Sequence, residues 1–159
     1  MPEQPKYTDR KKALAAMQQY CAYQDRCHKE VRDKLRQLGV YSDWTEEIIT
    51  ELIQDKFLDE ERFARSYARG KFRIKRWGRN RIVRELKMRQ ISAYCIKKAL
   101  TEIEEEEYER VMEEEVLKRH RLEKKAKHPW LKRRKLVDQM VKRGYEAHLL
   151  WPLLDRLGI

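Results

Sequence analysis

The sequence has little of what a β-protein or a membrane protein needs. Only 5 Gly and 4 Pro interrupt its 159 residues, and no window shows the sustained two-residue alternation of apolar and polar side chains found in half-buried strands. No apolar run approaches the roughly 20 residues of a membrane-spanning helix, and the segment MPEQPKYTDRKK lacks the apolar middle of a secretory signal. We therefore expect an all-α, cytoplasmic protein with no membrane partner.

Residue patterns that support catalysis or metal binding are also scarce. The 3 cysteines cannot all pair with one another, and the spacing of Cys21, Cys27 and His28 is not that of a zinc site. The chain contains no glycine-rich phosphate loop, no nucleophile elbow and no repeated motif of His and carboxylate residues. We expect a protein that is not an enzyme and binds no metal or cofactor.

What the chain does contain is one apolar spacing that occurs three times. Residues four apart on a helix share a face, and an apolar residue five positions further on packs back across the turn that ends the helix. The three sets are Val31, Leu35 and Val40; Ile82, Leu86 and Ile91; and Leu136, Met140 and Tyr145. The spacing alone is common in helical proteins, but here each set is also followed by a second amphipathic helix and preceded by a third. A period of about fifty residues indicates tandem three-helix units.

The turn inside each unit carries its own signal. Gly39 and Gly144 occupy the position at which a left-handed helix cap is expected, whereas the middle unit has Gln90 there. That middle cap is therefore either strained or of another type. Pro152 predicts a kink or a short final helix, because proline inside a helix removes a hydrogen bond. Helix starts are predicted at Thr8 or Asp9, at Asp43 with Glu46 as a capping box, at Asp59, at Ser92 and at Pro129.

We expect three tandem three-helix repeats, each like a helix-turn-helix module, in an elongated and curved arrangement. The predicted modules span residues 8–57, 58–104 and 105–159. Units of this size bury small cores and contact mainly their neighbours in the chain. We expect the protein to be a monomer.

Charge distinguishes the three units. The net charge is +11, which indicates a polyanionic partner. Residues 69–90 contain ten Lys and Arg side chains against Glu85 alone, and residues 118–135 contain ten against Glu123 alone. Residues 102–115 lie between these two basic blocks and contain nine glutamates. The acidic segment is more typical of a helix start than of a metal site, and it would repel nucleic acid or engage a basic patch on a protein.

Two interpretations of the basic blocks remain open. In one, the cations are solvated helix faces paired with Glu on neighbouring turns, as most charge runs are. In the other they contact nucleic acid or an acidic protein surface, and Phe72 and Trp77 either stack on bases or belong to the core. Local counter-charge is nearly absent from the first block, which favours contact. The candidate binding residues are Arg69, Lys71, Arg73, Lys75, Arg76, Arg79, Arg81, Lys132, Arg133 and Arg134.

One segment resembles a known protein family. Residues 58–64, LDEERFA, are similar to the LDD-x-RFA signature of RecX proteins, the bacterial modulators of the RecA recombinase. As in that family, a basic stretch, Gly78, Arg81-Ile82 and Glu85-Leu86 follow. Residues 26–39 and 143–145 also resemble family motifs, although Lys29 replaces the usual Ser in the first of them. In the middle unit, Gln90 stands where the family usually has Gly.

The resemblance implies a function. RecX proteins are curved rods of three-helix modules that lodge in the groove of RecA filaments and restrain recombinase, ATPase and coprotease activities. We therefore expect a non-enzymatic regulator that binds RecA nucleoprotein filaments, in the groove or at an end, in DNA repair and the SOS response. Contact with single-stranded or duplex DNA through the basic faces should show little sequence preference. The alternatives are a helix-turn-helix protein that recognises duplex DNA and a purely protein-binding helical scaffold.

Overall fold

The computed structural model describes residues 9–41, 43–124 and 127–159, so Thr8 in the first predicted module and Lys125 in the second basic block lie outside it. The described chain contains no strand, which confirms the all-α prediction. Its helices are α1 (Arg10–Tyr23), α2 (His28–Gln37), α3 (Asp43–Gln54), α4 (Glu60–Arg73), α5 (Arg79–Met88), α6 (Ala93–Leu100), α7 (Glu105–Leu122), α8 (Pro129–Lys142) and α9 (Ala147–Leu157).

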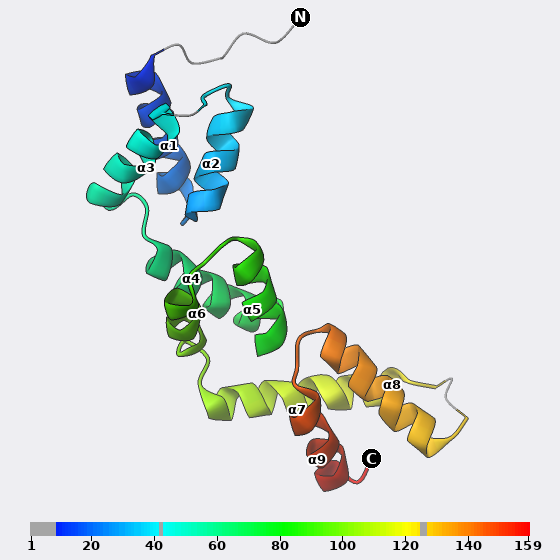
Figure 1. The fold of residues 1–159 in the computed structure, drawn as a ribbon. Helices are drawn as coiled ribbons and strands as arrows, with labels where there is room; N and C mark the ends of the chain where they lie inside the picture. Colours follow the sequence, from blue (N-terminus) through cyan, green and yellow to red (C-terminus); the bar gives the residue numbers. More distant parts are fainter. Residues whose placement is uncertain (1–8, 42, 125–126) are drawn as a thin grey trace, which may run out of the picture.

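The helices form three successive groups of three along an elongated path (Figure 1). The most extensive helix contacts lie within a group, such as α1 with α3, α4 with α6, and α8 with α9. We call α1–α3, α4–α6 and α7–α9 the first, second and third units. This arrangement confirms the predicted repeat, while the exact module boundaries stay a prediction.

The recurring spacing produces the same turn in each unit. The backbone N–H of the last apolar residue in each set donates to the carbonyl of the residue five positions earlier, which is the closing bond of a left-handed helix cap. The three bonds are Val40 to Leu35 at 2.9 Å, Ile91 to Leu86 at 3.1 Å and Tyr145 to Met140 at 3.1 Å. Gln90 has a φ of 60°, so the middle unit keeps the left-handed cap despite the cost of a side chain there.

Most predicted helix starts are confirmed. Side chains of Asp9, Asp59 and Ser92 accept hydrogen bonds from backbone N–H groups in the first turns of α1, α4 and α6, and Pro129 is the first residue of α8. The predicted cap at Asp43 is one position late, because Asp43 is already the first residue of α3. Pro152 lies inside α9, which continues past it to Leu157, so the final helix does not end at this proline.

Apolar burial divides the chain unequally. The first unit has its own core around Met17, Leu35 and Leu52. The second and third units share one continuous core, which runs from Phe63 to Leu154 and which Cys27 of the first unit enters. The expectation of a small separate core in each unit therefore holds for the first unit but not for the other two.

Candidate nucleic-acid and filament-binding surface

The first basic block lies on α4, the turn after it and α5, and its apolar residues hold these elements in place. Phe72, Ile82 and Leu86 are buried in the shared core, so the helical period directs the intervening Lys and Arg residues outward. Phe72 is therefore unavailable to bases. Trp77 is half-buried, with the Lys71 ammonium 5.0 Å and the Arg81 guanidinium 4.1 Å from its ring centroid. Trp77 thus holds two of the candidate cations by cation–π contact.

Three candidate residues of this block are paired inside the molecule. Arg69 lies 3.4 Å from Glu102, and Arg79 lies 2.9 Å from Glu105 and 2.7 Å from Glu146. Arg76 bonds to Glu114 and lies 3.4 Å from Glu115. These three arginines lack counter-charge only along the sequence. In space the acidic segment and Glu146 supply counter-charge, which corrects the interpretation of these three arginines as free to contact a partner.

Other cations of the block remain exposed to solvent. Arg73, Lys75, Arg84 and Lys87 are exposed and form no ion pair within the described residues. We call these four the central unpaired cations. Arg84 and Lys87 also line, with Asn80 and Met88, a shallow hollow on the outer side of α5. Arg84 and Lys87 were absent from the ten candidates, although their exposed positions on the α5 period would have identified them.

The second basic block lies apart from the first, near the start of α8. Arg133 is 2.5 Å from Asp155, and its guanidinium lies 5.7 Å from the Trp151 ring centroid, so it braces α8 against α9. Lys132 is half-buried and Arg134 is exposed, and the described part of the chain offers neither an ion pair. The backbone contact with the second unit is at Arg143 and Gly144, just beyond Lys142, the last residue of α8, which is nine residues after Arg133 and so about 14 Å further along the helix axis.

The second and third units meet through their backbones. The N–H groups of Gly78 and Asn80 donate to the carbonyls of Arg143 and Gly144 at 2.8 and 2.9 Å. A Cβ at Gly78 would lie 2.2 Å from the Gly144 carbonyl carbon, and one at Gly144 would lie 2.5 Å from the Arg81 Cβ. Only glycine permits this approach, because real Cβ atoms do not come within 3.0 Å of other heavy atoms.

A tyrosine pair completes this contact. The Tyr108 and Tyr145 rings pack with centroids 5.4 Å apart, and the Arg79 guanidinium lies 4.0 Å from the Tyr108 centroid. The Tyr108 hydroxyl donates to Glu146, and the Tyr145 hydroxyl donates to the Arg76 carbonyl at 2.8 Å. Burial raises the pKa of Tyr145 to about 12 and raises that of Tyr108 further, so both phenols stay protonated donors at neutral pH.

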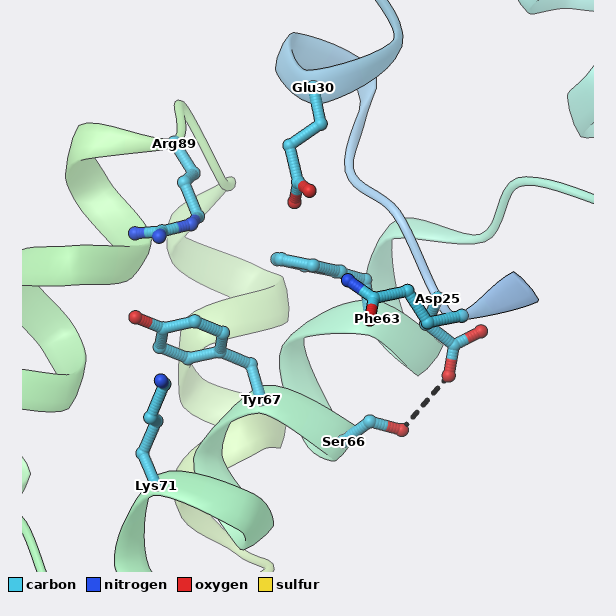
Figure 2. Close-up of a pocket in the computed structure, with 8 residues that line it drawn as sticks. Asp25, Glu30, Phe63, Ser66, Tyr67, Lys71 and Arg89 are labelled. Carbon is cyan, nitrogen blue, oxygen red and sulfur yellow. Dashed lines mark hydrogen bonds between the residues drawn. The ribbon is translucent and has the colours of Figure 1, made fainter. Parts of the chain in front are cut away.

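The first and second units meet differently, through side chains around an open hollow of about 610 Å³. Figure 2 shows Asp25 and Glu30 of the first unit opposite Tyr67, Lys71 and Arg89 of the second. Asp25 lies 2.8 Å from Arg62 and accepts a hydrogen bond from Ser66 at 3.1 Å. The LDEERFA segment is thus architectural: Asp59 caps α4, Arg62 bridges to the first unit, and Phe63 enters the core.

The cysteines are placed as small apolar residues. Cys21, Cys27 and Cys95 are buried, and burial raises the pKa of the Cys21 and Cys27 thiols to about 11. Such thiols are almost wholly protonated at neutral pH and are poor nucleophiles. Across residues 9–41, 43–124 and 127–159, no group of three His, Cys, Asp or Glu side chains is arranged to hold a metal ion. Within the same residues, no helix combines the length and apolar character required to cross a bilayer.

Comparison with known proteins matches this architecture. A family description of the second three-helix domain of RecX matches residues 59–100, which are α4 to α6. A regulatory protein RecX of Lactobacillus gasseri is 30% identical over 96 residues, and one of Bacillus thuringiensis is 26% identical over 140 residues. The chain is therefore similar to RecX proteins, and its residues 59–100 match the second three-helix domain of that family.

These RecX relatives are longer than the chain. The matched segments cover 60% of this chain and 35% of the Lactobacillus gasseri protein, and 87% of this chain and 51% of the Bacillus thuringiensis protein. The chain thus matches about half or less of each relative. The fold is similar to a crystal structure of RecX from Lactobacillus salivarius, with a TM-score of 0.78 and 24% identity over 94% of this chain and 96% of that one. A second crystal structure of regulatory protein RecX gives a TM-score of 0.84 and 22% identity over 92% and 73%.

Proposed function

We propose that this protein is a non-enzymatic regulator of the RecX family that binds RecA nucleoprotein filaments in the cytoplasm and restrains their activities. The observation that carries the proposal is the division of its cations. Arg69, Arg76 and Arg79 are paired with internal carboxylates, whereas the central unpaired cations remain exposed on the same unit. Internal pairing fixes the unit, and the remaining charge is available to a polyanion.

The shape of the protein supports this partner. An elongated body of three units offers a long surface that a filament with regularly repeated protomers can match (Figure 1). Because the second and third units share one core, we expect them to move together. A rigid body that contacts adjacent protomers would oppose the changes that accompany ATP turnover. Phosphate contacts need no base readout, so binding should be largely independent of DNA sequence.

The test measures RecA ATPase on single-stranded DNA as this protein is added, with binding to bare single-stranded DNA and to RecA without DNA measured in parallel. We expect inhibition of the ATPase, with tightest binding to the assembled filament. Inhibition far below one molecule per protomer would indicate action at filament ends, and a linear titration would indicate coating of the groove. Unchanged ATPase together with no preference for the filament would refute the proposal.

A helix-turn-helix mode on duplex DNA is the second candidate, favoured by the exposed row of Asn80, Arg84 and Lys87 on α5. The structure weakens it at one point. Arg79, the first residue of α5, is engaged with Glu105 and Glu146 and is not free to read bases. Selection from a randomised duplex library separates the candidates, because an enriched sequence supports the second and a flat profile supports the first. Salt-insensitive binding to RecA without DNA would instead indicate a purely protein-binding scaffold.

A further inference from the structure

The free end of the third unit carries apolar side chains that its core does not cover. This end, the last turn of α7 with the first turns of α8, projects away from the second unit (Figure 1). Leu122 and Leu131 are exposed, and Trp130 is 62% exposed, more than the 40% of Trp151. Within the described residues the Trp130 ring has no aromatic or cationic neighbour in contact. We call Leu122, Trp130 and Leu131 the apolar tip.

Exposed cations lie beside the apolar tip. Lys118, Arg121 and Arg134 are exposed there, and no ion pair occupies them within the part of the chain that the structure describes. Two other cations act as braces instead. Lys135 lies 3.0 Å from Glu123 and so ties α8 to the end of α7, and Arg133 is bound to Asp155. Ion pairs therefore fix the apolar tip to the rest of the third unit, and the tip presents an exposed indole and unpaired cations.

Helical register pairs an exposed apolar group with an exposed cation on each of the two helices. Trp130 and Arg134 are four residues apart in α8, so they share a face and are separated by about 6 Å along its axis. On α7, Lys118 and Leu122 have the same relation. Each helix thus presents one apolar group and one cation on one face at the tip.

We propose that the apolar tip binds single-stranded nucleic acid, with a base stacked on Trp130 and the backbone phosphates on Arg134, Lys118 and Arg121. An exposed aromatic ring among unpaired cations is the arrangement that single-strand-binding surfaces use, because every base has a π-face and every nucleotide a phosphate. A duplex hides its base faces by stacking, so it would use the cations alone. Charge complementarity with a polyanion selects this occupant over an apolar protein segment. The inference deepens the proposed function only in that DNA is the polyanion, and it requires no RecA.

The experiment measures affinity of the full chain for fluorescein-labelled oligothymidylate and for an abasic oligonucleotide of the same length. Trp130→Ala should weaken oligothymidylate binding roughly five- to hundredfold, the range of one lost base stack. Its affinity for the abasic strand should not change. Trp130→Phe should retain most of the binding, and Arg134→Gln should weaken binding to both strands. The control is Tyr41→Ala, which removes an equally exposed aromatic residue from a hollow lined by charges of both signs, Arg32, Arg36, Asp43, Glu46 and Glu47.

Several outcomes would overturn the inference. Equal loss with both strands, no loss with either, or an effect of Trp130→Ala on RecA binding alone would each do so, and the last would indicate a protein partner at the tip. Because Trp130 is exposed, its variants should fold, which circular dichroism verifies. Failure of the two proposals is distinguishable. Normal ATPase inhibition without Trp130-dependent binding refutes the tip, and Trp130-dependent binding without inhibition refutes RecA regulation.

Discussion

The two joints of this molecule are built from different chemistry. Between the second and third units, backbone amides of Gly78 and Asn80 bond across the contact, and a single core continues through it. Between the first and second units, Cys27 enters the same core, and polar side chains such as Asp25 and Arg62 make contact beside an open hollow. Main-chain contacts allow one geometry, whereas long side chains on a hydrated surface tolerate several. The comparison indicates a rigid body of the second and third units, to which the first is attached adjustably.

The acidic segment belongs to the rigid body. Its Glu102, Glu105 and Glu114 are bonded to arginines of the second unit, so it neutralises part of a basic surface and fixes the orientation of α7. What looks along the sequence like a basic surface followed by an acidic one is in space partly a set of internal pairs, those of Arg69, Arg76 and Arg79. The unpaired remainder, rather than the whole basic block, is the surface available to a partner.

The sharpest way to break the rigid joint is Gly78→Ala. The added methyl would lie 2.2 Å from backbone of Gly144, which has no side chain that can move aside. Overpacking against backbone should lower the free energy of unfolding by about 3 kcal/mol. The matched control is Gly70→Ala in α4, where nothing lies within 4 Å of the new methyl. It should be neutral or stabilise by up to about 1 kcal/mol. Urea denaturation of both variants checks this, and equal stabilities would contradict a backbone contact.

The ion pair at the rigid joint should contribute more to the stability of the fold than the ion pair at the joint of the first and second units. At the rigid joint the side chains of Arg79 and Glu146 are 23% and 15% exposed, whereas Arg62 and Asp25 at the other joint are 43% and 32% exposed. Removing one partner of a largely buried pair leaves a charge without compensation, so Arg79→Met should cost about 2 kcal/mol. Arg62→Met should cost less than about 1 kcal/mol. Thermal unfolding of the two variants in one buffer measures the difference, and a larger loss from Arg62→Met would reverse the comparison.

Alkaline pH should act on the rigid joint through its tyrosines. Burial raises the pKa of Tyr145 to about 12 from an ordinary value of 10.0. Above pH 10 the unfolded chain loses this proton while the folded chain keeps it, so stability is full below pH 10 and falls as pH rises toward 12. The loss should amount to about 2–3 kcal/mol. Tyr145→Phe should show a flatter dependence over that range in urea denaturation at stepped pH. The same slope in both proteins would mean that other groups, such as the lysines, account for all of it.

The smallest effect concerns the adjustable joint. Raised salt weakens exposed ion pairs such as that of Asp25 with Arg62, and leaves backbone hydrogen bonds largely unchanged. Spin labels at exposed Arg36 and Lys97 report on the joint of the first and second units, and labels at Lys97 and Asp138 on the rigid one. Only the first distance distribution should broaden with salt. Broadening of both would show that the two joints are equally adjustable.

The sequence predicted the repeat because its cause is local. The spacing of Leu86 and Ile91 describes one cap hydrogen bond, and the same bond occurs in each unit. Asp59 and Ser92 were likewise predictable as caps, since a cap needs only neighbouring residues. The pairing of the charged side chains, in contrast, depends on residues that are distant in the sequence. Arg79 and Glu146 are 67 positions apart, and no run of residues indicates that they meet.

The close contact of Gly78 with Gly144 could not be predicted either, because the two residues are far apart in the sequence. Gly144 was explained by its left-handed cap, and nothing in the sequence shows that its hydrogen atom also admits a neighbouring backbone. The sequence does not decide whether Trp77 stacks on bases or belongs to the core, and the structure places its ring between Lys71 and Arg81. Such pairings depend on the angle between two units, which helical periodicity does not encode.

The most direct measurement is the salt dependence of binding to RecA filaments on single-stranded DNA. One variant replaces Arg73, Lys75, Arg84 and Lys87 with Ala, and its control replaces four exposed lysines elsewhere, Lys11, Lys12, Lys97 and Lys142, so that both lose the same charge. If the central unpaired cations contact phosphates, the slope of log affinity against log salt should become shallower by about 3 in the first variant, at roughly 0.7 per contact. The control should keep the slope of the parent protein. Equal slopes in all three proteins would contradict the assignment of these four cations to the filament.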